Sequence, residues 1–246
     1  MKYFIASPFG NWIKPVGTIP VVGTYTLHAR GNRLWSAVRS LRYNFKMRGW
    51  TNRLQLPNPG VKVGLHQHIR GEVLSIAEVQ RGDFKELVQI IPVNQSVELN
   101  LSCPNLGTAL PWDSAEVFTK YKGTSWERKW CIAKLSPLTT PEQLEFLIDE
   151  LGFTQLHFSN TLPLGDGGRG GGLSGRVLRP YTLELIRLVR ENWGDTVTII
   201  AGGGVSDFGA VYEYLKEGAN HVSLGSVCFN PFKLRKILRQ GRYDEN

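Results

Sequence analysis

Short apolar segments alternate with longer amphipathic stretches along this chain of 246 residues. Apolar or alternating runs of four to six residues are typical of strands, whereas apolar residues at helical spacing indicate helices. The pattern predicts eight strands, at 3–6, 21–26, 73–78, 97–101, 131–135, 155–158, 197–201 and 221–224. It also predicts helices at about 113–121, 141–150, 181–192, 207–217 and 231–239.

The alternation of strands and helices indicates an α/β fold. Such alternation favours a parallel sheet with right-handed crossovers. Eight strands, and a length close to the roughly 250 residues typical of the class, favour a closed (β/α)8 TIM barrel over an open sheet. No linker, repeat or low-complexity stretch is visible, so we expect residues 1–246 to form a single domain.

The cysteines and the hydropathy bear on location. Cys103, Cys131 and Cys228 are an odd number and contain no CxxC pair, so disulfide scaffolds and zinc ribbons are not expected. No apolar run approaches the roughly 18 residues of a membrane span, and the first residues lack the layout of a signal peptide. We therefore expect a cytoplasmic protein with no membrane partner.

The net charge of +8 is unevenly distributed. Residues 1–71 contain eleven Lys or Arg and no acidic residue, and Glu72 is the first acid. Aromatic residues such as Trp35 and Tyr43 lie among these cations. A mixture of this kind occurs both in solvated capping segments and in surfaces that bind nucleic acid, phosphate or acidic partners. Nucleic acid therefore stays open as a partner.

Polar residues gather where the predicted strands end. The fourth strand ends in Asn100, followed by Ser-Cys-Pro-Asn with Cys103 and Asn105. Parallel α/β proteins place their chemistry at this edge, and a thiol between carboxamides suits a base beside an imide-like substrate. A buried cysteine in a tight turn is the alternative interpretation.

The fifth and sixth predicted strands end in comparable features. Lys134 follows an apolar run and is costly to bury unless an anion meets it; a side chain reaching to the rim is the alternative. Ser159-Asn160-Thr161 precedes the glycine-rich stretch Gly165–Gly175, which we expect to be a loop, either wrapped around a ligand or mobile.

Two glycine turns follow the last two predicted strands. Gly202-Gly203-Gly204 and Gly225-Ser226 both precede predicted helices, whose N-terminal amides attract phosphate. A phosphate site after strands seven and eight recurs in these barrels. His66 and His68 have no third ligand nearby, so no metal is expected, and His157 is interpreted as a core histidine.

The motifs resemble those of the dihydroorotate dehydrogenases. ELNLSCPN, IAKLSP, FSNTL, GGGLSG, IIAGGGVSD and VSLGS follow one another in that family's order. The resemblance implies an FMN-containing barrel that oxidises dihydroorotate to orotate in pyrimidine biosynthesis. It makes Cys103, typical of the soluble class 1 branch, the catalytic base. Dimers are common in that class, so a homodimer is one hypothesis.

The resemblance also assigns binding roles. It implies substrate contacts for Asn52, Asn100, Asn105, Asn160 and Thr161. It implies FMN contacts for Ala6, Ser7, Thr24, Lys134, Gly175, Gly203, Gly204, Gly225 and Ser226.

Two departures from the family pattern concern the substrate. Gly23 stands where the family usually has a lysine, and Gln55 replaces a usual glycine beside Arg53. One hypothesis is that Arg53 replaces the missing cation. Two alternative functions remain open: a flavoenzyme like the tRNA dihydrouridine synthases, which share a related Asn-x-x-Cys-Pro turn, and a degenerate barrel without turnover.

Overall fold

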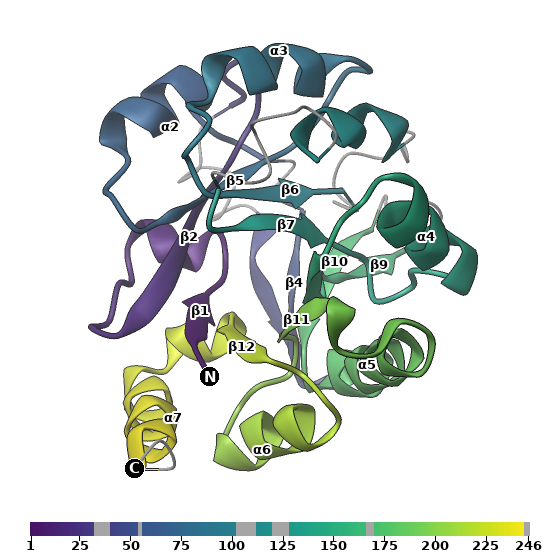
Figure 1. Ribbon diagram of the computed structural model, residues 1–246. Coiled ribbons are helices and arrows are strands. Elements are labelled where there is room, and N and C mark those ends of the chain that lie inside the picture. The colour runs from purple at the N-terminus through teal and green to yellow at the C-terminus, as the bar shows by residue number, and fades with distance from the viewer. Residues whose placement is uncertain (32–39, 54–55, 102–111, 120–127, 166–169, 244–246) are drawn as a thin grey trace.

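Eight parallel strands close into a barrel (Figure 1). The computed structural model describes residues 1–31, 40–53, 56–101, 112–119, 128–165 and 170–243. Neighbouring strands follow the order β1-β12-β11-β8-β7-β6-β5-β2, and β1 pairs with β2 to close the ring. The strands are β1 (Tyr3–Ile5), β2 (Thr18–Tyr25), β5 (Val73–Ile76), β6 (Val97–Asn100), β7 (Cys131–Lys134), β8 (Gln155–Phe158), β11 (Thr198–Ala201) and β12 (His221–Leu224).

The predicted barrel and its eight strands are confirmed. Strands β8 and β12 have the predicted bounds, and the others differ by one to three residues at an end. All four residues of β5 and all four of β6 are buried, as expected for strands covered on both faces. Burial on both faces explains why short apolar runs were a sufficient signal.

Helices lie around the outside of the barrel (Figure 1). The α-helices are α2 (Val61–Gln67), α3 (Asp83–Ile90), α4 (Pro141–Glu145), α5 (Arg179–Trp193), α6 (Phe208–Lys216) and α7 (Pro231–Tyr243). The shorter turns are 3-10 helices η1 (Phe9–Asn11), η3 (Trp112–Phe118), η6 (Arg176–Leu178), η7 (Gly194–Thr196) and η8 (Ser226–Phe229), with a π-helix η4 (Phe146–Glu150).

The predicted helices differ from the observed ones in type at two places. Around 113–121, the described residues form the 3-10 helix η3, and the 141–150 helix changes from α to π at Phe146. The capping box that begins α4 is present: Gln143 N donates to Thr140 Oγ1 and Thr140 N to Gln143 Oε1. The sequence pattern missed α2 and α3.

A second, antiparallel sheet was not predicted. It has the order β3-β4-β10-β9, formed by β3 (Arg42–Asn44), β4 (Gly49–Asn52), β10 (Gly171–Gly175) and β9 (Leu162–Leu164). The expectation of a loop over Gly165–Gly175 is therefore wrong for Gly171–Gly175. This segment is held as a strand because β4 and β9 hydrogen-bond to its two edges, and Leu173 is buried.

Among the described residues, no helix is long and apolar enough to cross a membrane.

Candidate functional site

A cavity of about 310 Å³ lies at the carboxyl ends of the barrel strands, within the size range of small-molecule sites. Segments that follow β1, β8, β11 and β12 contribute to its wall, together with β4 and β10 of the antiparallel sheet. All thirteen described residues with an expected role line it: Ala6, Ser7, Thr24, Asn52, Asn100, Lys134, Asn160, Thr161, Gly175, Gly203, Gly204, Gly225 and Ser226. Cys103 and Asn105 lie outside the described residues.

Two of the expected carboxamides contact each other. Asn160 Nδ2 donates to Asn100 Oδ1 over 2.8 Å, and Asn160 Oδ1 accepts from the amide of Thr161 over 2.9 Å. Asn100 Nδ2 lies 3.4 Å from Thr24 Oγ1. Asn52, the third expected carboxamide that the structure describes, comes from β4 and donates weakly to the Gly172 carbonyl, 3.4 Å away. These bonds fix the amide orientations, leaving donors and acceptors in defined positions.

The hydrogen-bond network continues from Thr24 into the interior of the barrel. Thr24 Oγ1 is 3.0 Å from Ser75 Oγ, and Ser75 Oγ donates to Glu98 Oε1 over 3.0 Å. On the other side of the carboxylate, His157 Nδ1 is 2.6 Å from Glu98 Oε2. Lys134 Nζ lies 3.7 Å from Glu98 Oε1. Glu98 and Lys134 are thus a buried ion pair that lies beneath the carboxamides of Asn100 and Asn160 and forms part of the floor of the cavity.

Glu98 is charged although its side chain has no exposure. Burial alone would raise the pKa of its carboxyl, but the charges of Lys134 and His157 and the hydrogen bonds from His157 and Ser75 together lower this pKa to about 2. Burial lowers the pKa of His157 and outweighs the opposing effect of Glu98. The floor therefore holds the Glu98 carboxylate, the Lys134 side chain 3.7 Å from it and an imidazole that burial drives toward its neutral form.

The glycine turns let backbone approach the cavity closely. Gly203 and Gly204 have φ of +82° and +72°, and a Cβ on Gly203 would lie 2.8 Å from Leu178 Cβ. The expected use of the helix N-termini that follow these turns stays a prediction. Asp207 Oδ1 already accepts from Ala210 N at the start of α6, and Gly225 leads into the four-residue η8. Gly203, Gly204, Gly225 and Ser226 of these turns line the cavity.

Gly23 lines the cavity in a conformation suited to glycine. Its φ is +114°, and a Cβ would lie 2.5 Å from the backbone oxygen of Ser75. The Asn11 side chain holds this segment, accepting from Gly23 N over 3.0 Å and donating to Gly23 O over 2.8 Å. The lysine usual in the family therefore has no room at this position in this backbone.

Arg53 is exposed and directed to the antiparallel sheet. Its Nε donates to the Gly170 carbonyl over 2.9 Å, and it is not among the described residues that line the cavity. The geometry therefore counts against Arg53 as the replacement cation. Lys134 is the cation among the described lining residues.

An aromatic part of the wall was missed by the sequence analysis. Trp12, Trp50 and Phe229 line the cavity, and the rings of Trp50 and Phe229 are 4.5 Å apart. Tyr43 continues this contact, with its ring 5.3 Å from that of Trp50. Trp50 belongs to the sheet whose pairing the sequence did not predict, so no local signal placed it at the site.

The amino-acid sequence of the chain matches that of a known protein family. The family model described as dihydroorotate dehydrogenase matches residues 21–241, which is most of the chain. The chain belongs to the dihydroorotate dehydrogenase family.

Curated members of the family resemble the chain at modest identity. A protein of Exiguobacterium sibiricum named dihydroorotate dehydrogenase B (NAD(+)), catalytic subunit, is 29% identical over 220 residues, covering 77% of this chain and 69% of its own. The protein of the same name from Staphylococcus carnosus is 30% identical over 218 residues, covering 77% and 70%.

The fold agrees with a solved member of the family. A crystal structure of the dihydroorotate dehydrogenase of Eimeria tenella in complex with ferulenol matches with a TM-score of 0.75 at 20% identity. The match covers 98% of this chain and 80% of the other. At this identity the likeness shows a shared fold.

Proposed function

We propose that the chain is an FMN-dependent oxidoreductase that oxidises dihydroorotate to orotate. The observation that carries the proposal is the single cavity that gathers all thirteen described residues expected to hold substrate or cofactor. Membership of the dihydroorotate dehydrogenase family supports the same reaction.

The residues of the cavity fit a flavin. Aromatic and aliphatic side chains suit a planar ring system, and the glycine turns suit a phosphate group. The Ser223 hydroxyl is a second observation that fits a bound ligand. Ser223 lines the cavity, and its buried Oγ has no hydrogen-bond partner among the described residues. A buried hydroxyl without a partner is costly, and a polar ligand in the cavity would satisfy it.

The chain's own residues would orient the substrate and handle its proton. Asn52, Asn100 and Asn160 bind the pyrimidine ring through their carboxamides, and the Cys103 thiolate accepts a ring proton. The Lys134 ammonium provides positive charge where the bound cofactor gains negative charge. When bound, FMN supplies the redox chemistry by accepting the hydride that leaves the neighbouring ring carbon.

The test is the visible spectrum of the purified protein, reconstituted with FMN where necessary. Anaerobic addition of dihydroorotate should bleach the flavin band. Cys103→Ser should slow the bleaching by about 100-fold or more, in the range expected for loss of a general base. Cys131→Ser is the matched control, because burial raises the pKa of the Cys131 thiol to about 12 and its Sγ contacts the Phe118 carbonyl.

Other outcomes identify the alternatives. A flavin that binds but is not bleached contradicts dihydroorotate as substrate, and salt-dependent RNA binding would then favour a dihydrouridine-type substrate. A colourless protein that FMN does not reconstitute contradicts the proposal and favours a barrel without turnover.

A further inference from the structure

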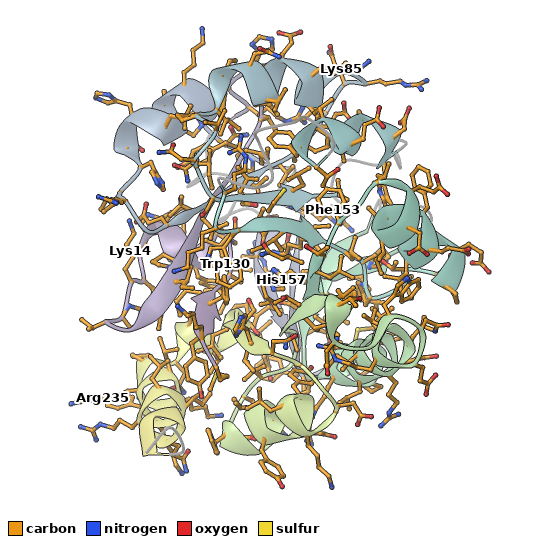
Figure 2. All side chains as sticks on the ribbon, viewed as in Figure 1. Lys14, Lys85, Trp130, Phe153, His157 and Arg235 are labelled. Atoms are coloured by element: carbon orange, nitrogen blue, oxygen red, sulfur yellow. The ribbon has the colours of Figure 1, made fainter. Side chains whose placement is uncertain are left out.

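Three titratable side chains from adjacent strands meet beneath the cavity. Glu98 comes from β6, Lys134 from β7 and His157 from β8, and these strands are neighbours in the barrel. Lys134 and His157 are direct partners in the register, and both line the cavity. Figure 2 labels His157 near the centre of the molecule, among the barrel strands. The proposed reaction assigns a role to Lys134 but none to Glu98 or His157.

The two bonds to Glu98 differ in length. His157 Nδ1 approaches one carboxylate oxygen to 2.6 Å, whereas Lys134 Nζ stays 3.7 Å from the other, which also accepts from Ser75. The imidazole bond has the length of a strong hydrogen bond, and the ammonium contact is only an ion pair. The hydrogen bonds to the carboxylate thus come from His157 and Ser75, whereas Lys134 interacts with it through charge alone.

The Lys134 ammonium is therefore not fixed to Glu98 by a hydrogen bond. A carboxylate that lost the imidazole bond would leave one buried oxygen unpaired, and such an oxygen is costly. Lys134 is the nearest described cation that could move to compensate. Its charge would then be drawn down toward Glu98 and away from the cavity.

We propose that His157 is a positioning residue for anion binding in the cavity. By hydrogen-bonding Glu98, it limits the pull of that carboxylate on Lys134, and the ammonium remains directed at negative charge on the bound ligand. The inference rests on the proposed flavin site, because FMN is the ligand whose binding reports it. A histidine that merely fills the core would affect stability but would not act through Lys134.

The experiment compares FMN binding by four chains: wild type, His157→Leu, Lys134→Met and the double variant. His157→Leu should raise the dissociation constant of FMN about tenfold. In the Lys134→Met background, the same substitution should change binding less than twofold, because the group through which His157 acts is gone. His157→Asn, whose side-chain amide can still donate to Glu98, should bind FMN within threefold of wild type.

The reduction potential of the bound flavin gives a second readout. Lys134 favours negative charge, so His157→Leu should weaken binding of reduced FMN more than of oxidised FMN. If the dissociation constant of reduced FMN rises tenfold more than that of oxidised FMN, the reduction potential of this two-electron couple becomes more negative by about 30 mV. His221→Leu is the control: this half-buried histidine also has its pKa lowered by burial, but it packs against Trp130 and does not line the cavity.

If His157→Leu fails to fold, Glu98→Gln still tests the inference, because this substitution is expected to change the FMN affinity in the opposite direction. Removing the carboxylate charge frees Lys134, so FMN should bind at least as tightly as in wild type. Weaker binding by Glu98→Gln overturns the inference. So does wild-type affinity in His157→Leu, or a His157→Leu effect undiminished in the Lys134→Met background. Failure of the wild type itself to bind FMN overturns the proposed function and the inference together.

Discussion

The barrel and the antiparallel sheet both contribute to the cavity, but they hold their residues in different ways. Under the cavity, barrel side chains form a continuous chain of hydrogen bonds from Asn160 to His157, with lengths of 2.6–3.0 Å except for a 3.4 Å link between Asn100 and Thr24. The sheet offers aromatic rings, glycine backbone and a weak 3.4 Å bond from Asn52. The barrel therefore holds charged and polar groups in fixed positions, and the sheet supplies an apolar cover.

The difference follows from what each region buries. Barrel strands are enclosed on both faces, so any polar group there must be paired. The tip of the β3–β4 hairpin is exposed, with Phe45 at 84% and Lys46 beside it. We therefore expect substitutions to cost most in the barrel and least in the sheet.

The largest effect is expected for Gly23→Ala in barrel strand β2. The new Cβ would lie 2.5 Å from the backbone oxygen of Ser75, and the residue would have to adopt a φ of +114°. A steric clash and backbone strain would therefore both destabilise the folded state. The free energy of unfolding in urea should fall by about 3 kcal/mol. Gly82→Ala is the control for backbone strain alone, because its φ is +102° and nothing lies within 4 Å; its cost should be about 1 kcal/mol. Equal losses would contradict the tight packing around Gly23.

The next effect concerns the acid stability of the barrel floor. The pKa of Glu98 is about 2 in the folded protein, below its ordinary value of 4.5, so its contribution is present above pH 4.5 and is lost as pH falls toward 2. By pH 3 about 2 kcal/mol of that contribution should be gone.

The measurement uses two chains that both carry His157→Asn, so that no imidazole titrates beside the carboxyl. One of them also carries Glu98→Gln. The gap between their unfolding free energies should narrow from pH 7 to pH 3, but by less than about 2 kcal/mol, because His157 no longer contributes to the low pKa of Glu98. A gap independent of pH would show that the Glu98 carboxyl is not held as an anion.

The same contrast explains what the sequence could predict. The eight barrel strands and the strand-end residues Asn100 and Lys134 were readable because apolar runs and chain order determine them locally. The pairing of Asn52 with Gly172 joins segments 120 residues apart, and glycine-rich β10 has no alternating pattern to reveal it. Glu98 and His157 looked unrelated in sequence, although their strands lie close together in the barrel. Lys134, at the end of an apolar strand between them, was the available clue.

In the sheet, Trp50→Ala should affect ligand binding more than stability. Trp50 contacts Phe229 and Tyr43 at the edge of the cavity, so FMN should bind about tenfold more weakly, while unfolding free energy falls by only about 1 kcal/mol. Trp193→Ala is the control, because this half-buried tryptophan bonds to Asp149 away from the cavity. Loss of the barrel fold in Trp50→Ala would contradict the view of the sheet as a cover.

The smallest effect is expected for Arg53→Ala. Arg53 is exposed and bonds to the backbone of Gly170, so its removal should cost less than about 0.5 kcal/mol of stability. In titrations of the FMN-loaded protein, the affinities for orotate and dihydroorotate should stay within twofold of wild type. Arg42→Ala, which removes another exposed cation of the hairpin, is the matched control. A tenfold loss in Arg53→Ala alone would mean that Arg53 does replace the family lysine, and that the sheet supplies charge as well as cover.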